Sequence, residues 1–492
     1  MKQYRLLIGG EQVDAASGET FDAVNPTTGE TWATHALAAA EDVDRAVRAA
    51  SHAFESEAWR GLSPTRRGRL MLRLADLIAE RAEEIAKVEV ADNGKLYKEM
   101  LAQLRVIPDW LYYFGGLADK VEGRVIPLDR TSVLNYTLRE PLGVIGIIIP
   151  WNSPVLLTMY SLAPALAAGN TVVVKPSEHA SASVLETLGL AAEAGFPPGV
   201  INVVSGESEA GEALVEHPGV VKISFTGSEK TGARIASRAG ARLGQVTLEL
   251  GGKSPNIVFP DAALDAAEAG VLAGIFAAGG QSCVAGSRAL FHREIYDELL
   301  ERIRLRAGAV VVGNPMDDAT QMGPIANNPQ LARVEEMVDA ARSGGARIVA
   351  GGTRAAVEQF PQGLWYDPTI LDGVGNEAQI AQDEVFGPVL TVLPFETEEE
   401  AIAIANDTRF GLASGVWTRD LKRAHRVARA LKAGTVWLNT YRAITFNSPF
   451  GGVKESGFGR VNGAEAIEGY LQTKSVWCEL SDDVSDPFVM KV

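Results

Sequence analysis

The chain has 492 residues, of which 46% are apolar and 22% are charged. This composition is typical of a soluble globular protein, and the length exceeds what a single hydrophobic core supports, so two or three domains are expected. The net charge of −16 argues against nucleic acid and against an anionic membrane as partners.

Cys283 and Cys478 are the only cysteines, too few for a disulfide framework, so a reducing, cytoplasmic location is expected. The N-terminal apolar run is too short for a signal peptide. The longest tight apolar run, Val144 to Ile149, is too short to span a bilayer. The six histidines are scattered and Cys283 has no close metal-type partner, so no metal site is expected.

The first third of the chain combines short strands with a long helical region. Residues 1–35 have the pattern of short strands and turns. Residues 41–116 have apolar residues at helical spacing, and their charge runs are interpreted most simply as solvated helix faces. Residues 121–140 alternate polar and apolar side chains, which predicts exposed strands at an edge or interface.

The centre of the chain repeats strands and helices. Between residues 142 and 250, apolar strands alternate with helical crossovers of about 10–15 residues, which predicts an α/β fold with a doubly wound parallel sheet. The helices expected among these crossovers include Pro154–Ala168 and Ala180–Ala194. A second, weaker α/β pattern runs from the helix expected at 263–278 to about residue 438. Residues 469–492 have the pattern of a strand followed by an acidic tail.

Ligands of such sheets bind at the carboxyl ends of the strands. The loops expected there are Pro150–Asn152, Lys175–Glu178, Ser205–Gly206, Thr226–Ser228 and Leu250–Gly252. The sheet carries no Gly-x-Gly-x-x-Gly fingerprint. Gly252-Lys253-Ser254 is not the end of a phosphate loop, because position 247 is Thr where that loop requires Gly.

For three residues, the sequence pattern alone does not decide between a functional and a structural interpretation. Cys283 follows Gly279 and Gly280, so it is either a thiol presented to a cleft or a buried, inert cysteine. Glu249 ends a predicted strand, where it is either a general base for water or a surface glutamate. Asn152 is either a donor to an oxyanion or part of a helix N-cap region.

Three further loops have features that fit a nucleotide, each of them weak alone. Lys175 and Glu178 could hydrogen-bond a ribose, and the same loop can simultaneously be a capped helix start. Thr226–Ser228 opens a predicted helix after a strand, where free N–H groups favour a pyrophosphate. Glu384 could hydrogen-bond a sugar and Phe386 could pack against a flat ring, or the two residues could form a turn before a strand.

Taken together, these segments form one ordered set. The motifs, in chain order, are Pro150–Asn152, Lys175–Glu178, Phe225–Ser228, Leu248–Pro255, Gly280–Cys283, Glu384–Pro388 and Ser448–Lys454. The set resembles the aldehyde dehydrogenase superfamily over roughly residues 20–477.

The resemblance implies a catalytic set and a reaction. Cys283 would be the nucleophile, Glu249 the general base, and Asn152 the oxyanion donor together with the Cys283 backbone N–H. The thiolate would attack an aldehyde, hydride would pass to a nicotinamide, and water activated by Glu249 would hydrolyse the thioester to a carboxylic acid.

The resemblance also implies NAD as cofactor, preferred over NADP because Glu178 would repel a 2′-phosphate. It places Lys175 and Glu178 on the adenosine ribose, and Glu384 and Phe386 at the nicotinamide riboside. The complete expected cofactor set is Ile148, Pro150, Trp151, Lys175, Ser177, Glu178, Gly206, Gly211, Phe225, Thr226, Gly227, Ser228, Thr231, Leu250, Glu384 and Phe386.

The substrate tunnel implied by the motif alignment is mostly apolar and aromatic. Its expected residues are Leu157, Tyr160, Ser282, Val284, Arg442, Ile444 and Phe450. This mixture suits an uncharged or partly apolar aldehyde. Arg442, near the mouth, could meet a carboxylate, although a solvated arginine is the simpler interpretation. Val461 and Asn462 follow Gly459-Arg460, where many relatives carry a glutamate, and no catalytic meaning is attached to this departure.

The resemblance implies an NAD-binding domain at residues 1–120 and 142–253 and a catalytic domain at 254–453. Residues 121–141 and 454–492 would form an oligomerisation arm and C-terminal tail, which favours a homodimer or homotetramer.

Three alternatives to simple aldehyde oxidation remain. Relatives that pass the acyl group to coenzyme A usually lack the general-base glutamate, so Glu249 favours hydrolysis. A semialdehyde or hydroxy-aldehyde specialist would use the same mechanism. The third alternative is a dehydrogenase that has lost its activity and serves as a structural or NAD-binding protein. The intact Cys283, Glu249 and Asn152 argue against it.

Overall fold

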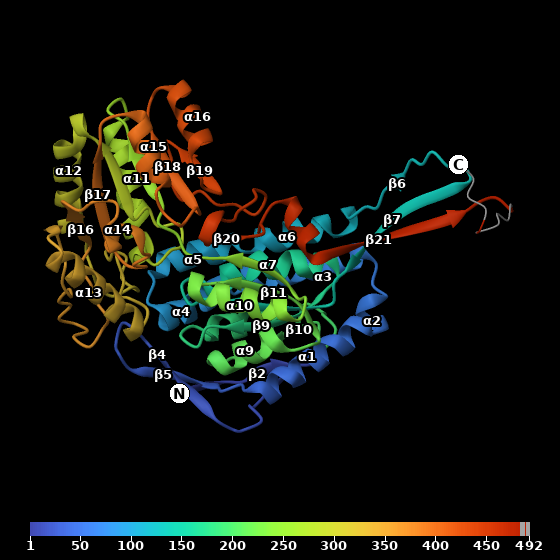
Figure 1. Cartoon of the computed structure of the whole chain (residues 1–492). Coiled ribbons are helices and arrows are strands. Elements are labelled where there is room, and N and C mark those ends of the chain that lie inside the picture. The colour runs from blue at the N-terminus through green and yellow to red at the C-terminus, as the bar shows by residue number, and fades with distance from the viewer. Residues whose placement is uncertain (483–487, 489–492) are drawn as a thin grey trace.

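The computed structural model describes residues 1–482 and residue 488 and contains two α/β domains with a projecting arm (Figure 1). The larger sheet has eight strands in the order β20-β12-β11-β8-β9-β10-β2-β3. Its strands are β2 (Leu6–Ile8), β3 (Glu11–Val13), β8 (Val144–Ile149), β9 (Thr171–Pro176), β10 (Ile201–Val203), β11 (Val220–Thr226), β12 (Gln245–Glu249) and β20 (Gly457–Phe458). The central strands β12, β11, β8, β9 and β10 are parallel. The doubly wound parallel sheet predicted from the sequence is confirmed.

The helices of this domain surround the sheet and make its core. They are α1 (Ala40–Glu55), α2 (Glu57–Arg60), α3 (Pro64–Glu80), α4 (Ala82–Asn93), α5 (Tyr97–Val106), α6 (Pro108–Leu117), α7 (Pro154–Ala168), α8 (Ala182–Gly189), α9 (Ser208–Glu216) and α10 (Glu229–Ala241). The strand β8 is buried along its whole length, as its continuous apolar sequence predicts for a strand covered on both faces.

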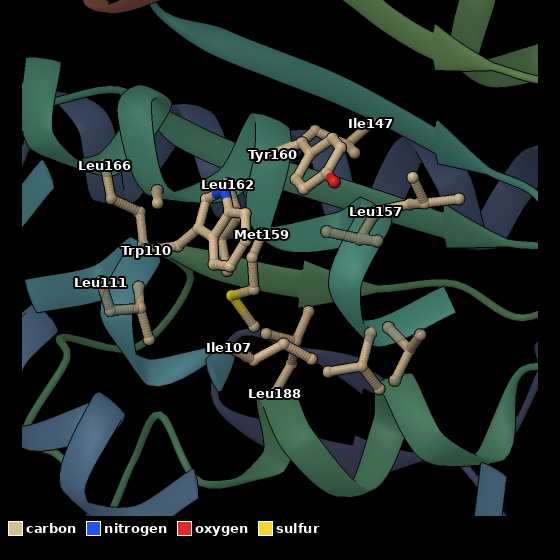
Figure 2. Close-up of a cluster of buried hydrophobic side chains, with 14 of the residues drawn as sticks. Ile107, Trp110, Leu111, Ile147, Leu157, Met159, Tyr160, Leu162, Leu166 and Leu188 are labelled. Atoms are coloured by element: carbon tan, nitrogen blue, oxygen red, sulfur yellow. The ribbon is translucent and has the colours of Figure 1, made fainter. Parts of the chain in front are cut away.

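The helix α7 fixes the position of the loop that precedes it. Leu157, Met159, Leu162 and Leu166 of this helix lie in a cluster with Trp110 and its neighbours (Figure 2). Full burial of one such aliphatic side chain contributes about 1.5–3 kcal/mol. A helix held along its whole length in this way keeps the residues at its N-terminus, including Asn152, in one place.

The second sheet has seven strands in the order β15-β16-β17-β14-β13-β18-β19. These are β13 (Pro255–Val258), β14 (Arg288–His292), β15 (Arg347–Ala350), β16 (Thr369–Asp372), β17 (Val389–Phe395), β18 (Ala413–Trp417) and β19 (Thr435–Leu438). The accompanying helices are α11 (Leu264–Phe276), α12 (Tyr296–Gly308), α13 (Asn328–Ser343), α14 (Gln379–Gln382), α15 (Glu398–Asn406) and α16 (Leu421–Ala430). Only β15 is antiparallel to its neighbour.

Two small sheets complete the described fold. One joins β1 (Lys2–Tyr4), β5 (Thr31–Ala36) and β4 (Thr20–Val24). The other joins β21 (Leu471–Glu479), β7 (Val133–Pro141) and β6 (Val125–Ile126), and its long strands β7 and β21 project from the body as an arm (Figure 1).

The C-terminal segment of the arm was predicted to begin at residue 454, but in the structure it begins later in the chain. Leu248 and Glu249 of β12 pair with Phe458 and Gly457 of β20, so this segment belongs to the large sheet. The following 3-10 helix Ala464–Tyr470 packs against α7. The chain reaches the arm only at Leu471. The predicted acidic tail, apart from residues 480–482 and 488, lies outside the described residues.

Candidate active site

The loop that carries Cys283 depends on its glycines. Ala278, Gly279 and Gly280 have φ values of 57°, 60° and 69°, the left-handed region that favours glycine. A Cβ at Gly280 would lie 2.0 Å from the Gly387 carbonyl oxygen. The glycines that the sequence singled out therefore allow a tight turn against a neighbouring loop, and this turn presents Cys283.

Asn152 ties this loop to the N-terminus of α7. Its Nδ2 donates a hydrogen bond of 3.1 Å to the carbonyl oxygen of Gln281, two residues before the thiol. The Gln281 side chain is held in turn, because its Oε1 accepts from the Ala326 N–H at 2.9 Å. Asn152 thus lies beside Cys283, and its remaining N–H group can serve a ligand.

Glu249 is buried at the end of β12, and neither carboxylate oxygen has a hydrogen-bond partner. Burial raises the pKa of this carboxyl well above its usual range, and the charge of Arg460 opposes the rise. A carboxyl with both oxygens unsatisfied is costly in the interior, which is typical of a functional position. The alternative of a surface glutamate is wrong.

The Cys283 thiol is largely enclosed. Burial raises its pKa to about 12, the carboxylates of Glu384 and Glu249 add to the rise, and the Arg442 guanidinium opposes it. At neutral pH the thiol is therefore protonated in the protein alone, and a cationic ligand beside it would favour the reactive thiolate.

A long groove leads to Cys283 from the large sheet. It consists of two cavities of about 370 and 350 Å³ that share Pro150, Trp151 and Thr226–Ser228. Every predicted cofactor residue except Gly206 lines one or both of them. The lining residues that were not predicted from the sequence are Ile149, Ser208, Glu212, Val215, Glu229, Lys230, Arg234, Ile235, Arg238, Gly251, Gln330 and Arg333. Several of these belong to α9 and α10, whose pattern on the sequence is that of ordinary amphipathic helices.

Gly206 is the exception among the predicted cofactor residues, since it does not line the groove. A Cβ there would lie 2.8 Å from the Ala38 carbonyl oxygen and 3.1 Å from the Ala210 side chain. This glycine therefore serves close packing of three segments.

Lys175 and Glu178 form an ion pair at the far end of the groove. The ammonium of Lys175 is buried and lies 3.5 Å from a carboxylate oxygen of Glu178. Burial opposes ionisation of Glu178, but Lys175 and a backbone N–H outweigh it and hold the pKa of the carboxyl below its usual range. Glu178 is therefore a fixed negative charge in the groove.

The near end of the groove has an aromatic and an acidic residue. The rings of Trp151 and Phe386 meet edge to face with centroids 5.3 Å apart. Phe386 has φ +57°, a strained conformation for a residue with a side chain, which is common at functional sites. The Gly252 N–H donates to Glu384 Oε1 at 2.9 Å and thereby orients its carboxyl group.

A third cavity of about 240 Å³ also borders Cys283. All seven predicted substrate residues line it. The cavity and the groove meet at residues common to both linings, which are Asn152, Leu157, Thr226, Glu249, Leu250 and Cys283. The Cys283 thiol, the Glu249 carboxyl and the Asn152 amide therefore lie where the groove and the third cavity join.

The helical region before residue 117 contributes to this third cavity, which the sequence did not indicate. Lys95, Gln103 and Trp110 line it. The interpretation of the charge runs as solvated faces is wrong here, because Glu89 and Lys95 are 0% and 4% exposed. Lys95 donates to Ser153 Oγ at 3.0 Å, so its charge is held at the cavity wall.

Within residues 1–482 and 488, no group of three or more His, Cys, Asp or Glu side chains is arranged to hold a metal ion. In the same residues no helix is both long enough and apolar enough to cross a membrane.

A groove and a smaller cavity meet at the Cys283 thiol, so two ligands can reach it together. The aldehyde dehydrogenase family model matches residues 13–476. The chain belongs to the aldehyde dehydrogenase family, whose members are oxidoreductases acting on aldehydes.

Individual relatives match along the whole chain. The (Z)-2-((N-methylformamido)methylene)-5-hydroxybutyrolactone dehydrogenase of Acinetobacter baylyi is 45% identical over 494 positions that cover 100% of both proteins. The crystal structure of a putative aldehyde dehydrogenase from Burkholderia cenocepacia is 46% identical with a TM-score of 0.96, and the match covers 99% of this chain and 100% of that one. The NAD+ complex of aldehyde dehydrogenase from Bacillus cereus is 42% identical with a TM-score of 0.95, covering 98% and 97%.

Proposed function

We propose that this protein oxidises an aldehyde to the corresponding carboxylic acid with NAD, through a thiohemiacetal and a thioester on Cys283. The observation that carries the proposal is the place of Cys283, Glu249 and Asn152, which line both the groove and the smaller cavity. At this junction one carbon atom can meet a nucleophile and a hydride acceptor at the same time.

The polar groups that line the groove suit NAD. The N-terminus of α10, capped by Ser228, presents backbone N–H groups suited to a pyrophosphate. Lys175 and Glu178 would hold the hydroxyls of one ribose, and Glu384 those of the other. Bound there, NAD supplies the acceptor for the hydride. The NAD+ complex of the Bacillus cereus relative supports the same cofactor.

The residues of this chain would carry the remaining steps. As the thiolate, after its proton has passed to solvent, the Cys283 sulfur forms a bond to the aldehyde carbon, and the oxyanion accepts hydrogen bonds from Asn152 Nδ2 and the Cys283 backbone N–H. Loss of hydride leaves a thioester. Glu249 takes a proton from water, which attacks the thioester carbon, and the carbon–sulfur bond breaks to release the acid and the thiolate.

The first experiment is NADH formation by the purified protein with a panel of aliphatic, aromatic, hydroxylated, amino and carboxylated aldehydes. NADH formation without coenzyme A supports hydrolysis, whereas strict dependence on coenzyme A would replace hydrolysis by acyl transfer. NAD binding without NADH from any aldehyde would support an NAD-binding protein that has lost its activity.

We predict that NAD is preferred over NADP because of Glu178. A 2′-phosphate beside this carboxylate would meet like charge, so Glu178→Gln should raise kcat/KM for NADP by about 10-fold or more. Steady-state kinetics with both cofactors measure the ratio. Glu209→Gln removes an exposed charge of α9 outside the groove and should leave the ratio unchanged. A wild-type preference for NADP would contradict the proposal.

The arm is proposed to join copies of this chain into a homodimer or homotetramer. The edge strand β21 is largely exposed, and Trp477 on it is 64% exposed. Unpaired strand edges and exposed aromatic side chains are typical of interfaces. Trp477→Glu should weaken association by about 30-fold or more, as measured by sedimentation velocity across concentrations. Leu305→Glu, on α12, should not change the assembly, and a monomeric wild type would refute the proposal.

A further inference from the structure

The cavity on the substrate side of Cys283 carries excess positive charge. Its basic side chains are Lys95 and Arg442, and its only carboxyl group is that of Glu249. Two basic side chains thus line the cavity against a single carboxyl group. The cavity is therefore suited to a ligand that brings its own negative charge.

Arg442 is fixed at the cavity wall. Its Nη1 donates to the carbonyl oxygens of Ala273 at 3.3 Å and Ala277 at 2.9 Å, at the C-terminal end of α11. The end of a helix carries partial negative charge, which holds a guanidinium there. The backbone at Arg442 has φ +64°, a conformation that residues with side chains rarely adopt. The interpretation as a freely solvated arginine is wrong, because the side chain is half-buried and anchored.

The anchoring leaves much of the guanidinium available. Among the described residues, Nη2 and Nε of Arg442 have no hydrogen-bond partner and no carboxylate forms an ion pair with it. A guanidinium presents five N–H groups in a planar fork that matches a carboxylate. One nitrogen therefore fixes the position of Arg442, and the others can bind an anion.

Lys95 supplies a second, deeper charge. Its Nζ donates to Ser153 Oγ, and no carboxylate of the described residues lies within ion-pair distance of it. Glu99 is the strongest neighbouring charge, but it does not line the cavity, and its Oε1 accepts from the Ala278 N–H at 3.2 Å. Burial lowers the pKa of Lys95 only to about 8, so it is still mostly charged at neutral pH. A buried cation without an ion-pair partner is costly unless a ligand neutralises it.

We propose that the substrate is a semialdehyde, an aldehyde that carries a carboxylate at the other end of a short apolar chain, with this carboxylate bound by Arg442 in the field of Lys95. The inference rests on the proposed aldehyde oxidation. The apolar walls, which include Leu157, Ile444 and Phe450, suit the methylene groups between the two ends. The volume of about 240 Å³ lies below the roughly 300–1,000 Å³ of sites for drug-sized ligands, as expected for a small substrate.

The test compares glutaric semialdehyde with hexanal, a neutral aldehyde of similar length. The wild type should have the higher kcat/KM for glutaric semialdehyde. Arg442→Met should lower that value by about 10- to 100-fold, mainly through KM, and should change the value for hexanal by less than about 3-fold. Arg442→Lys should recover part of the loss. The exposed Arg419, outside the cavity, provides the matched control, and Arg419→Met should change neither value.

Arg442 also lowers the pKa of Cys283, so the ratio of the two substrates is the decisive quantity. A general effect on the thiol would slow both aldehydes equally, and an unchanged ratio in Arg442→Met would overturn the inference. A wild-type preference for hexanal would do the same.

A binding experiment separates this inference from the proposed reaction. Calorimetry with NAD-loaded Cys283→Ala protein should show tighter binding of glutaric semialdehyde than of hexanal. Adding Arg442→Met should weaken the binding of glutaric semialdehyde about 10-fold or more. If neither aldehyde yields NADH, the proposed reaction fails, and this titration still decides whether the cavity selects a carboxylate.

Discussion

Replacing Cys283 with serine is expected to lower the rate of NADH formation by about 10⁴-fold or more, for every aldehyde that the wild type oxidises. A serine hydroxyl keeps the size of the side chain but stays un-ionised, so no strong nucleophile remains between the groove and the cavity. Steady-state assays with the best substrate measure the loss, and NAD binding should stay within about 3-fold of the wild-type value.

Cys478 provides the matched control, because it is the other free cysteine and is exposed on the arm strand β21. Cys478→Ser should keep full activity. Equal loss in both variants would indicate damage to the fold or assembly, and substantial activity in Cys283→Ser would refute the thioester route.

The raised pKa of Cys283 can be tested through the pH dependence of thiol alkylation. The Cys478→Ser protein is suited to this test because it has a single thiol. Because burial raises this pKa to about 12, the thiolate fraction should rise about 10-fold per pH unit from pH 7 to 10. The alkylation rate with iodoacetamide should follow it. NAD, whose nicotinamide is cationic, should raise the rate at pH 7. An alkylation rate that is already independent of pH near 7 in the absence of NAD would show that the thiol is ionised without a cationic ligand.

The sequence predicted the sheet well because its strands are continuous apolar runs between clear turn signals. The helix predicted at 154–168 coincides with α7, which begins at Pro154 and ends before Gly169. The helix predicted at 180–194 was too long, since α8 ends at Gly189. Alanine and leucine continue after this glycine, so periodicity alone did not mark the end.

The candidate site was predictable where a residue follows a strand or belongs to a motif. Cys283, Glu249 and Asn152 line one cavity: Asn152 and Cys283 lie in loops, and Glu249 is the last residue of β12. Lys95 was not predictable, because its burial depends on contact between the α4–α5 connection and Ser153, which are far apart in sequence. The orientation of Arg442 depends likewise on the end of α11.

Replacing Glu249 with glutamine is expected to separate the two halves of the reaction. The amide has nearly the shape of the carboxyl but cannot take a proton from water, so the thioester should form and then persist. The steady-state rate should fall by about 10²- to 10⁴-fold, while rapid mixing should still show a first turnover with one NADH per active site. Mass spectrometry of the quenched protein should find the acyl group on Cys283.

The pH dependence of thioester hydrolysis in the wild type provides a second test of the role of Glu249. Burial holds the pKa of Glu249 well above its usual range, so the carboxyl must lose its proton before it can act as a base, and the rate of thioester hydrolysis should rise with pH through that pKa. In Glu249→Gln this rise should disappear, and added hydroxylamine, a nucleophile that needs no general base, should restore turnover. If the variant instead lost the first turnover as well, Glu249 would be required to form the thioester, and its role would lie in activating the thiol.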